Sequence, residues 1–83
     1  MKLGKFKIHK SLYDNDNGLK DVKAVLANVA VTRCEYLFGE GVFKFTGISD
    51  MFDDIDYSLI IPEYKFNLLW CEEDVRIEVV KKT

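Results

Sequence analysis

Alternation of apolar and polar residues predicts a β-strand near each end of the chain. Residues 3–8 place Phe6 and Ile8 on one face and lysines on the other. Residues 75–79 alternate valine or isoleucine with arginine and glutamate. A period of two residues is typical of a strand with one buried face.

Residues 18–28 fit two secondary structures. Leu19, Val22 and Leu26 recur at helical spacing, with lysine, aspartate and asparagine between them, and we favour a short helix. The alternative is a strand, because several of these residues are β-branched and an Asn-Gly pair also starts hairpins. The preceding residues 13–18, rich in aspartate and asparagine, are typical of a turn.

The middle of the chain predicts a hairpin. Residues 29–38 are rich in β-branched and aromatic side chains, residues 39–41 (Gly-Glu-Gly) form a short loop, and residues 42–48 form the second strand.

The last third contains two further strand-like segments. Residues 49–56 form a polar connection that we expect to include one helical turn. Residues 57–61 and 64–70 flank Pro62, which marks a bend, a bulge or a sheet edge because proline cannot donate to a ladder. Residues 71–74 turn the chain into the final strand.

These elements predict a single α+β domain over residues 1–83: a small antiparallel sheet of four to five strands with one short helix. If residues 18–28 were a strand, the fold would be all-β. The expected core residues are Phe6, Ile8, Leu26, Phe43, Phe45, Phe66, Leu68, Trp70, Ile77 and Val79.

Apolar residues exceed what so short a chain is expected to bury. A domain of this size buries only about 60–65% of its unfolded surface, whereas 48% of the residues are hydrophobic. The surplus predicts a sheet face or edge that contacts a partner. The apolar anchors that we expect there are Tyr36, Phe38, Tyr57, Ile61 and Tyr64.

Acidic residues cluster in the 49–56 connection, at Asp50, Asp53, Asp54 and Asp56. A solvated loop is the favoured interpretation of these residues, and a hard-cation site is an alternative. Within the hypothesis of a protein partner, we expect this loop to steer association with a basic surface, since fixed charge accelerates encounter. No metal site is expected elsewhere, because the segment ending at Gly18 does not have the register of an EF-hand loop.

The two cysteines, Cys34 and Cys71, are predicted to be reduced and at least partly buried, with a disulfide as the alternative. Together with the single histidine, His9, they are too few for a zinc site. The first ten residues have no continuous apolar stretch, and the longest apolar runs fall far short of the roughly 20 residues that span a bilayer. We therefore expect a cytoplasmic protein without a membrane segment.

No catalytic or phosphate-binding motif is present, so we expect neither an enzyme nor a cofactor. The favoured hypothesis is a non-catalytic protein-interaction module, a stoichiometric inhibitor or adaptor of the kind found in viruses and mobile elements, whose partner is another protein. A self-assembling subunit, such as a homodimer, is an alternative.

Single-stranded nucleic-acid binding is a further alternative. It would use the basic residues Lys5, Lys7, His9 and Lys10. Alternation directs the neighbouring aromatics to the opposite face, however, and an isoelectric point near 5.3 opposes binding to a polyanion.

Overall fold

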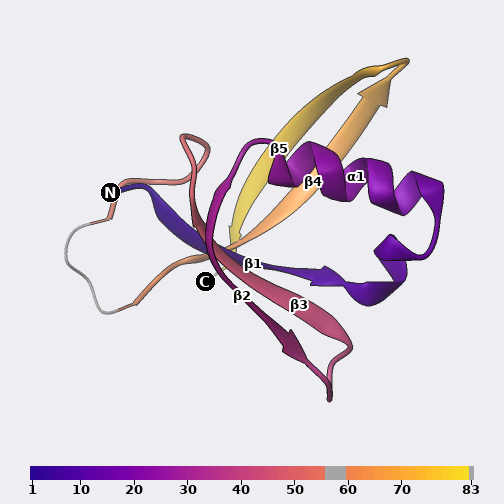
Figure 1. The fold of residues 1–83 in the computed structure, drawn as a ribbon. Helices are drawn as coiled ribbons and strands as arrows, with labels where there is room; N and C mark the ends of the chain where they lie inside the picture. The colour runs from indigo at the N-terminus through magenta and orange to yellow at the C-terminus, as the bar shows by residue number, and fades with distance from the viewer. Residues whose placement is uncertain (56–59, 83) are drawn as a thin grey trace.

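Five strands form one sheet in the order β2-β3-β1-β4-β5, and one α-helix lies over one of its faces (Figure 1). The computed structural model describes residues 1–55 and 60–82. The strands are β1 (Leu3–His9), β2 (Ala30–Leu37), β3 (Val42–Ile48), β4 (Glu63–Cys71) and β5 (Asp74–Lys82). A 3₁₀ turn, η1 (Lys10–Tyr13), precedes the helix α1 (Asp16–Leu26).

The α+β class, the strand number and the single helix are confirmed. The sheet is mixed rather than wholly antiparallel as expected, because β1 and β4 run parallel while the other neighbouring strands run antiparallel. The backbone N–H of Ser49, just after β3, donates to Lys2 just before β1 at 3.1 Å. The connection after β3 therefore starts beside the beginning of β1, and the backbone N–H of Lys5 then meets Pro62, the residue before β4, at 3.0 Å. β1 and β4 therefore begin at the same end of the sheet and run in the same direction.

The helix predicted at residues 18–28 is present and begins two residues earlier, which excludes the all-β alternative. Asn15 caps its N-terminus, accepting a hydrogen bond from the backbone N–H of Gly18 at 2.7 Å. Val22 and Val25 are buried against the sheet, and Lys23 between them is exposed. Burial of this apolar stripe outweighs the modest helix propensity of valine.

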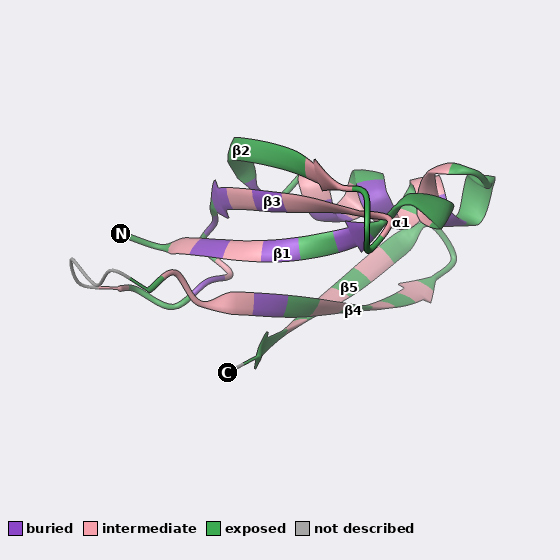
Figure 2. Ribbon diagram, turned by 90° about the horizontal axis from the view of Figure 1, so that it is seen from below, coloured by how far each residue is buried: buried purple, intermediate pink, exposed green. Residues whose placement is uncertain are grey.

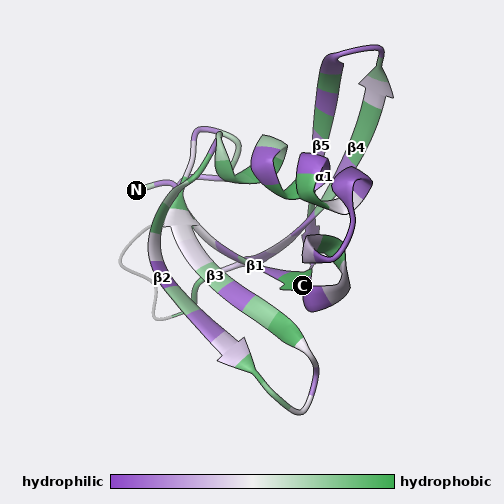
Figure 3. Cartoon of the chain, turned by 45° about the vertical axis from the view of Figure 1, so that its right-hand side comes forward, coloured by the Kyte–Doolittle hydropathy of each residue, from purple (hydrophilic) through white to green (hydrophobic). Residues whose placement is uncertain are grey.

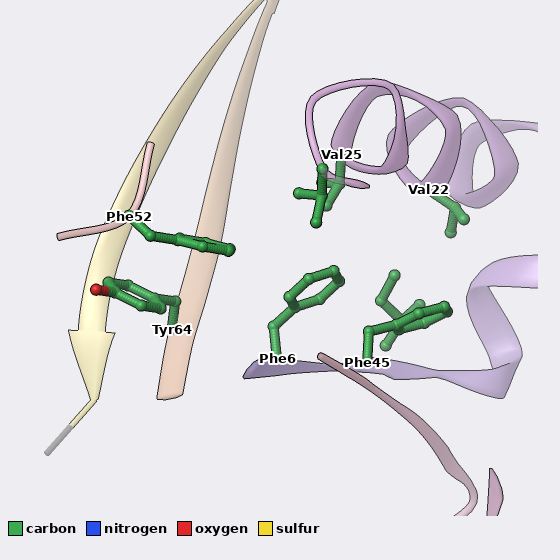
Figure 4. Close-up of a cluster of buried hydrophobic side chains, with 8 residues drawn as sticks. Phe6, Val22, Val25, Phe45, Phe52 and Tyr64 are labelled. Atoms are coloured by element: carbon green, nitrogen blue, oxygen red, sulfur yellow. The ribbon is translucent and has the colours of Figure 1, made fainter. Parts of the chain in front are cut away.

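Aromatic rings fill the space between α1 and the sheet (Figure 4). Phe6, only 1% exposed, stacks on Phe45 with ring centroids 5.3 Å apart and meets Phe66 edge-on at 5.0 Å. In the described part of the chain, the buried hydrophobic residues are Phe6, Ile8, Val22, Val25, Val29, Phe45, Phe52 and Tyr64.

Two paired glycines make room for these rings. Gly4 and Gly47 lie opposite each other on β1 and β3. A Cβ atom on Gly4 would lie 2.8 Å from the rings of Phe52 and Tyr64, and one on Gly47 would lie 2.6 Å from the side chain of Val29. Phe52, Tyr64 and Val29 therefore fit against the inner face of the sheet because the two glycines have no side chains there.

The predicted core is confirmed for Phe6, Ile8 and Phe45. Five further predicted residues are partly buried and pack against the core: Leu26, Phe43, Phe66, Leu68 and Val79. Trp70 and Ile77 are half-buried, on a part of the sheet that extends beyond this cluster.

That part is the β4–β5 hairpin. β1 and β4 share a single register pair, Lys5 and Glu63, whereas β4 and β5 stay paired from Glu63 opposite Lys82 to Cys71 opposite Asp74. Beyond Glu63 the two strands diverge from β1 as a two-stranded arm (Figures 1 and 3). In place of the helical turn expected in 49–56, the described residues form a hydrogen-bonded turn, with the backbone N–H of Phe52 on Ser49 at 3.1 Å. The strand expected at 57–61 lies mostly outside the described residues, and residues 60–61 are not in a strand.

Candidate functional site

The helix covers β1 and β3 but leaves β2 open. The residues of α1 and β1 alternate between buried and exposed positions, whereas β2 is exposed over six of its eight residues (Figure 2). Val31 and Cys34 pair with Gly47 and Phe45, so they belong to the inner face of the sheet. Both are nevertheless exposed, because β2 is the edge strand beyond the reach of α1.

Four aromatic residues meet where β2 ends and β3 begins. The ring of Phe43 contacts Tyr13 at 5.1 Å and Tyr36 at 4.9 Å between centroids. The ring of Tyr36 in turn meets Phe38 edge-on at 4.7 Å. Phe43 packs on the core, while the Phe38 residue is 88% exposed. We call Tyr13, Tyr36, Phe38 and Phe43 the aromatic surface; it leads from the core outward to solvent.

The loop geometry positions this surface. Gly41 adopts a φ of 64°, a conformation that favours glycine, and its N–H donates to Leu37 at 2.9 Å. The carbonyl of Gly41 accepts a hydrogen bond from the backbone N–H of Lys10 at 3.0 Å. This bond holds η1 against the hairpin, which places Tyr13 beside Phe43.

The pKa of Tyr13 indicates how polar the surroundings of the aromatic surface are. Burial raises the pKa of the Tyr13 phenol above its ordinary value, and negative charge on Cys34 raises it further. The ring therefore sits in a partly desolvated environment next to an exposed thiol.

The acidic loop lies at the other end of the sheet. It follows the end of β3 opposite to the aromatic surface, and the seven residues of β3 span about 20 Å. Asp50 is exposed; Asp53 forms an ion pair with Lys81 at 3.7 Å. Asp54 accepts a hydrogen bond from the amino group of Met1, which holds the pKa of its carboxyl below the ordinary value. The predicted site residues Asp56 and Tyr57 lie outside the described residues.

Tyr64 must be corrected as a surface anchor. It is 4% exposed, stacks on Phe52 with centroids 4.6 Å apart, and its hydroxyl accepts a hydrogen bond from the backbone N–H of Asp53 at 3.0 Å. The even parity of β4 points Tyr64 inward, and the hydroxyl finds its partner inside the fold. Ile61 is half-buried beside a hollow of about 360 Å³ on the outer face, away from Tyr36 and Phe38.

The predicted nucleic-acid residues lie mainly on the outer face of β1. Lys5, Lys7 and His9 alternate with the buried Phe6 and Ile8. Lys7 forms an ion pair with Glu40 at 3.0 Å, which raises the pKa of the lysine. The His9 ring bonds to Ser11, and Lys10 is exposed at the start of η1. The neighbouring aromatics are in the core, so these lysines have no stacking platform beside them on their face of β1.

A cavity of about 270 Å³ lies where β1 and β4 diverge beneath α1. Its lining is mixed: the apolar residues include Leu12 and Val25, and the charged residues include Lys7 and Lys65. Both carboxylates in the lining hold structural contacts: Asp21 accepts from the Trp70 indole at 2.6 Å, and Glu63 pairs with Lys82 at 3.3 Å.

The prediction of buried cysteines is wrong, since Cys34 and Cys71 are both free and exposed. Cys34 is on the edge strand β2, which the helix does not cover. Cys71 is the last residue of β4, next to the turn of the β4–β5 arm. No signal in the sequence distinguishes these positions from core positions, because the order of the strands in the sheet decides which of them are buried. Within residues 1–55 and 60–82, no group of three or more histidine, cysteine, aspartate or glutamate side chains is arranged to hold a metal ion.

Comparison with known proteins gives no match to a family model, to a curated protein or to a solved structure. Neither α1 nor any other helical segment in the described part of the chain is long and apolar enough to cross a membrane.

Proposed function

We propose that the protein is a non-catalytic interaction module of the cytoplasm, an inhibitor or adaptor, that binds another protein through the aromatic surface. The observation that carries this proposal is the position of Phe38, which is 88% exposed yet held edge-on by Tyr36 at 4.7 Å. Burying such a ring in a partner releases a large apolar area from water. Because a neighbouring ring already orients it, less side-chain freedom is lost on binding.

Tyr13 and Tyr36 complete the anchor. Each combines an apolar ring with a hydroxyl that can hydrogen-bond to a partner, a combination enriched at interfaces. The exposed inner face of β2, with Val31 and Cys34, continues the surface toward the other end of the sheet.

The acidic loop acts as a second, electrostatic contact. Its separation of about 20 Å from the aromatic surface exceeds the Debye length of about 8 Å at physiological salt. It therefore steers only a partner that extends along β3, as an interface of about 800 Å² per side does.

Photo-crosslinking tests the proposal. A photoreactive phenylalanine analogue replaces Phe38 in one protein and Leu69 in another, and each is irradiated in lysate of the cells that produce the protein. Leu69 is the matched control, since it is 62% exposed but lies on the outer face of the β4–β5 arm. We expect a protein adduct at position 38 that excess unlabelled wild type suppresses and excess Phe38→Asp does not.

Three outcomes contradict the proposal: no adduct at position 38, equal adducts at both positions, or an adduct that nuclease treatment removes. The last outcome would favour the nucleic-acid alternative.

A further inference from the structure

The outer edge of β5 is unpaired within the described part of the chain. β5 is the last strand in the sheet order, and its register with β4 runs without a bulge from Asp74 to Lys82. Natural edge strands are commonly short, bulged or interrupted by proline, because an open ladder recruits other strands. β5 is nine residues long and has none of these interruptions.

The hairpin turn determines which backbone groups face outward. Cys71 and Asp74 flank a two-residue turn, so they form a hydrogen-bonded pair, and every second residue of β5 from Asp74 onward points its N–H and C=O toward β4. The N–H and C=O groups of Val75, Ile77 and Val79 therefore face the open edge. The side chains of these three residues are half-buried on the inner face, where Val79 packs against the core.

Two charged side chains on the outer face of β5 have a self-complementary order. Arg76 and Glu78 flank Ile77 and alternate with the apolar residues along the strand (Figure 3). Their neighbours on β4 are the uncharged Leu69 and Asn67, and no ion pair joins either of them to another described residue.

This order of charges fits a pair of chains related by a two-fold axis through Ile77. In antiparallel pairing with a second copy, Ile77 faces its own counterpart, and Val75 faces Val79 of the other chain. Each Arg76 then faces a Glu78, which forms two symmetric ion pairs. The outward N–H and C=O groups of the three apolar residues also meet as hydrogen-bonded pairs in this register.

The neighbouring registers are unfavourable. Shifting the axis to Glu78 places two glutamates opposite each other, and shifting it to Arg76 does the same with two arginines. A shift by a single residue would place an inner-face side chain opposite an outer-face one, which the pleat forbids. An axis at Val75 would also pair Asp74 with Arg76, but only residues 74–76 of the two β5 strands would then overlap. Charge and the length of paired strand together therefore select the axis at Ile77.

We infer that two copies of the chain associate through antiparallel pairing of their β5 strands about Ile77, which joins the two sheets into one. The occupant of this edge is thus a second copy, and the dimer leaves both aromatic surfaces open. The inference is independent of the proposed function, since the two surfaces are at opposite edges of the sheet.

Sedimentation equilibrium of the full chain tests the inference with four proteins: wild type, Arg76→Glu, Glu78→Arg and the double variant that exchanges the two charges. We expect a reversible dimer of the wild type, a loss of affinity of about tenfold or more in each single variant, and recovery in the double variant. Both substituted positions are exposed, so circular dichroism should show that each of the three variants remains folded.

Nuclear Overhauser spectra of a mixed sample, half isotopically labelled and half unlabelled, locate the contact. In the inferred register, the Hα atoms of Arg76 and the other chain's Glu78 lie close together, because they form a non-hydrogen-bonded pair. An intermolecular Hα–Hα cross-peak between them supports the inference. A wild type that stays monomeric up to about 1 mM, or a dimer whose affinity the double variant does not recover, overturns it.

Discussion

The indole Nε1 of Trp70 donates a hydrogen bond of 2.6 Å to the Asp21 carboxylate, joining the projecting end of β4 to helix α1. The ammonium group of Lys20 lies 4.1 Å from the centre of the same ring. Because β4 leaves β1 after one register pair, this contact ties the far end of the arm to the helix.

Replacing Trp70 by phenylalanine removes the donor but keeps an aromatic ring. We expect a loss of about 1.5–3 kcal/mol, the range for a hydrogen bond to a charged group, measured by urea unfolding followed by far-ultraviolet circular dichroism. Asp21→Asn is the control, since its amide oxygen still accepts the bond and should cost less. A Trp70→Phe variant as stable as the wild type would contradict a stabilising role for this hydrogen bond.

Adding a methyl group to Gly4 should destabilise the protein. Its Cβ would lie 2.8 Å from two aromatic rings of the core, and overpacking of this kind costs about 1–3 kcal/mol. Gly39→Ala is the matched control, because nothing lies within 4 Å of its added Cβ, and thermal unfolding should leave it near the wild type. A Gly4→Ala variant as stable as Gly39→Ala would contradict the close packing of Phe52 and Tyr64.

The turn between β4 and β5 contains a strained residue. Glu72 adopts a φ of 58°, which costs a residue with a side chain about 1–2 kcal/mol. We expect Glu72→Gly to stabilise the protein by about 0.5–1 kcal/mol, since part of the relief is offset by greater freedom in the unfolded chain. Glu73→Gly removes the same charge from the same turn without relieving strain, and chemical denaturation should show no gain. A gain of similar size in both variants would assign the effect to charge.

Stability should fall at alkaline pH through Tyr13. Burial raises its pKa in the folded chain above the ordinary value of 10.0. Between these two values the unfolded chain binds fewer protons than the folded one, so the free energy of unfolding decreases as the pH rises. Melting temperatures measured across this window should fall more steeply for the wild type than for Tyr13→Phe. Parallel curves would mean that the phenol is as solvated in the fold as in the unfolded chain.

Local patterns predicted most of the elements. Alternation identified β1 and β5, and the Gly-Glu-Gly loop identified the β2–β3 hairpin, because these signals depend only on neighbours along the chain. The helix was harder, since Val22 and Val25 favour strands by propensity and become helical through burial against Phe6 and Phe45.

Exposure depended on strand order, which no local pattern encodes. Tyr64 and Tyr36 have similar sequence surroundings, yet Tyr64 is buried against Phe52, while Tyr36 is on the edge that the helix does not reach. The same reason explains why Cys34 is exposed. Phe38 was expected outside the core, because the sequence carries more apolar residues than a small interior holds. This residue is 88% exposed.

The central claim is tested most directly by measuring how tightly the chain binds the partner protein that is captured through position 38. Titration calorimetry compares wild type, Phe38→Ala and Leu69→Ala; the last two truncate exposed apolar side chains and should fold normally. We predict that Phe38→Ala weakens binding about 30-fold or more, as loss of an interface anchor worth about 2 kcal/mol does, while Leu69→Ala stays close to wild type. Equal affinities for all three proteins would contradict a docking role for the aromatic surface.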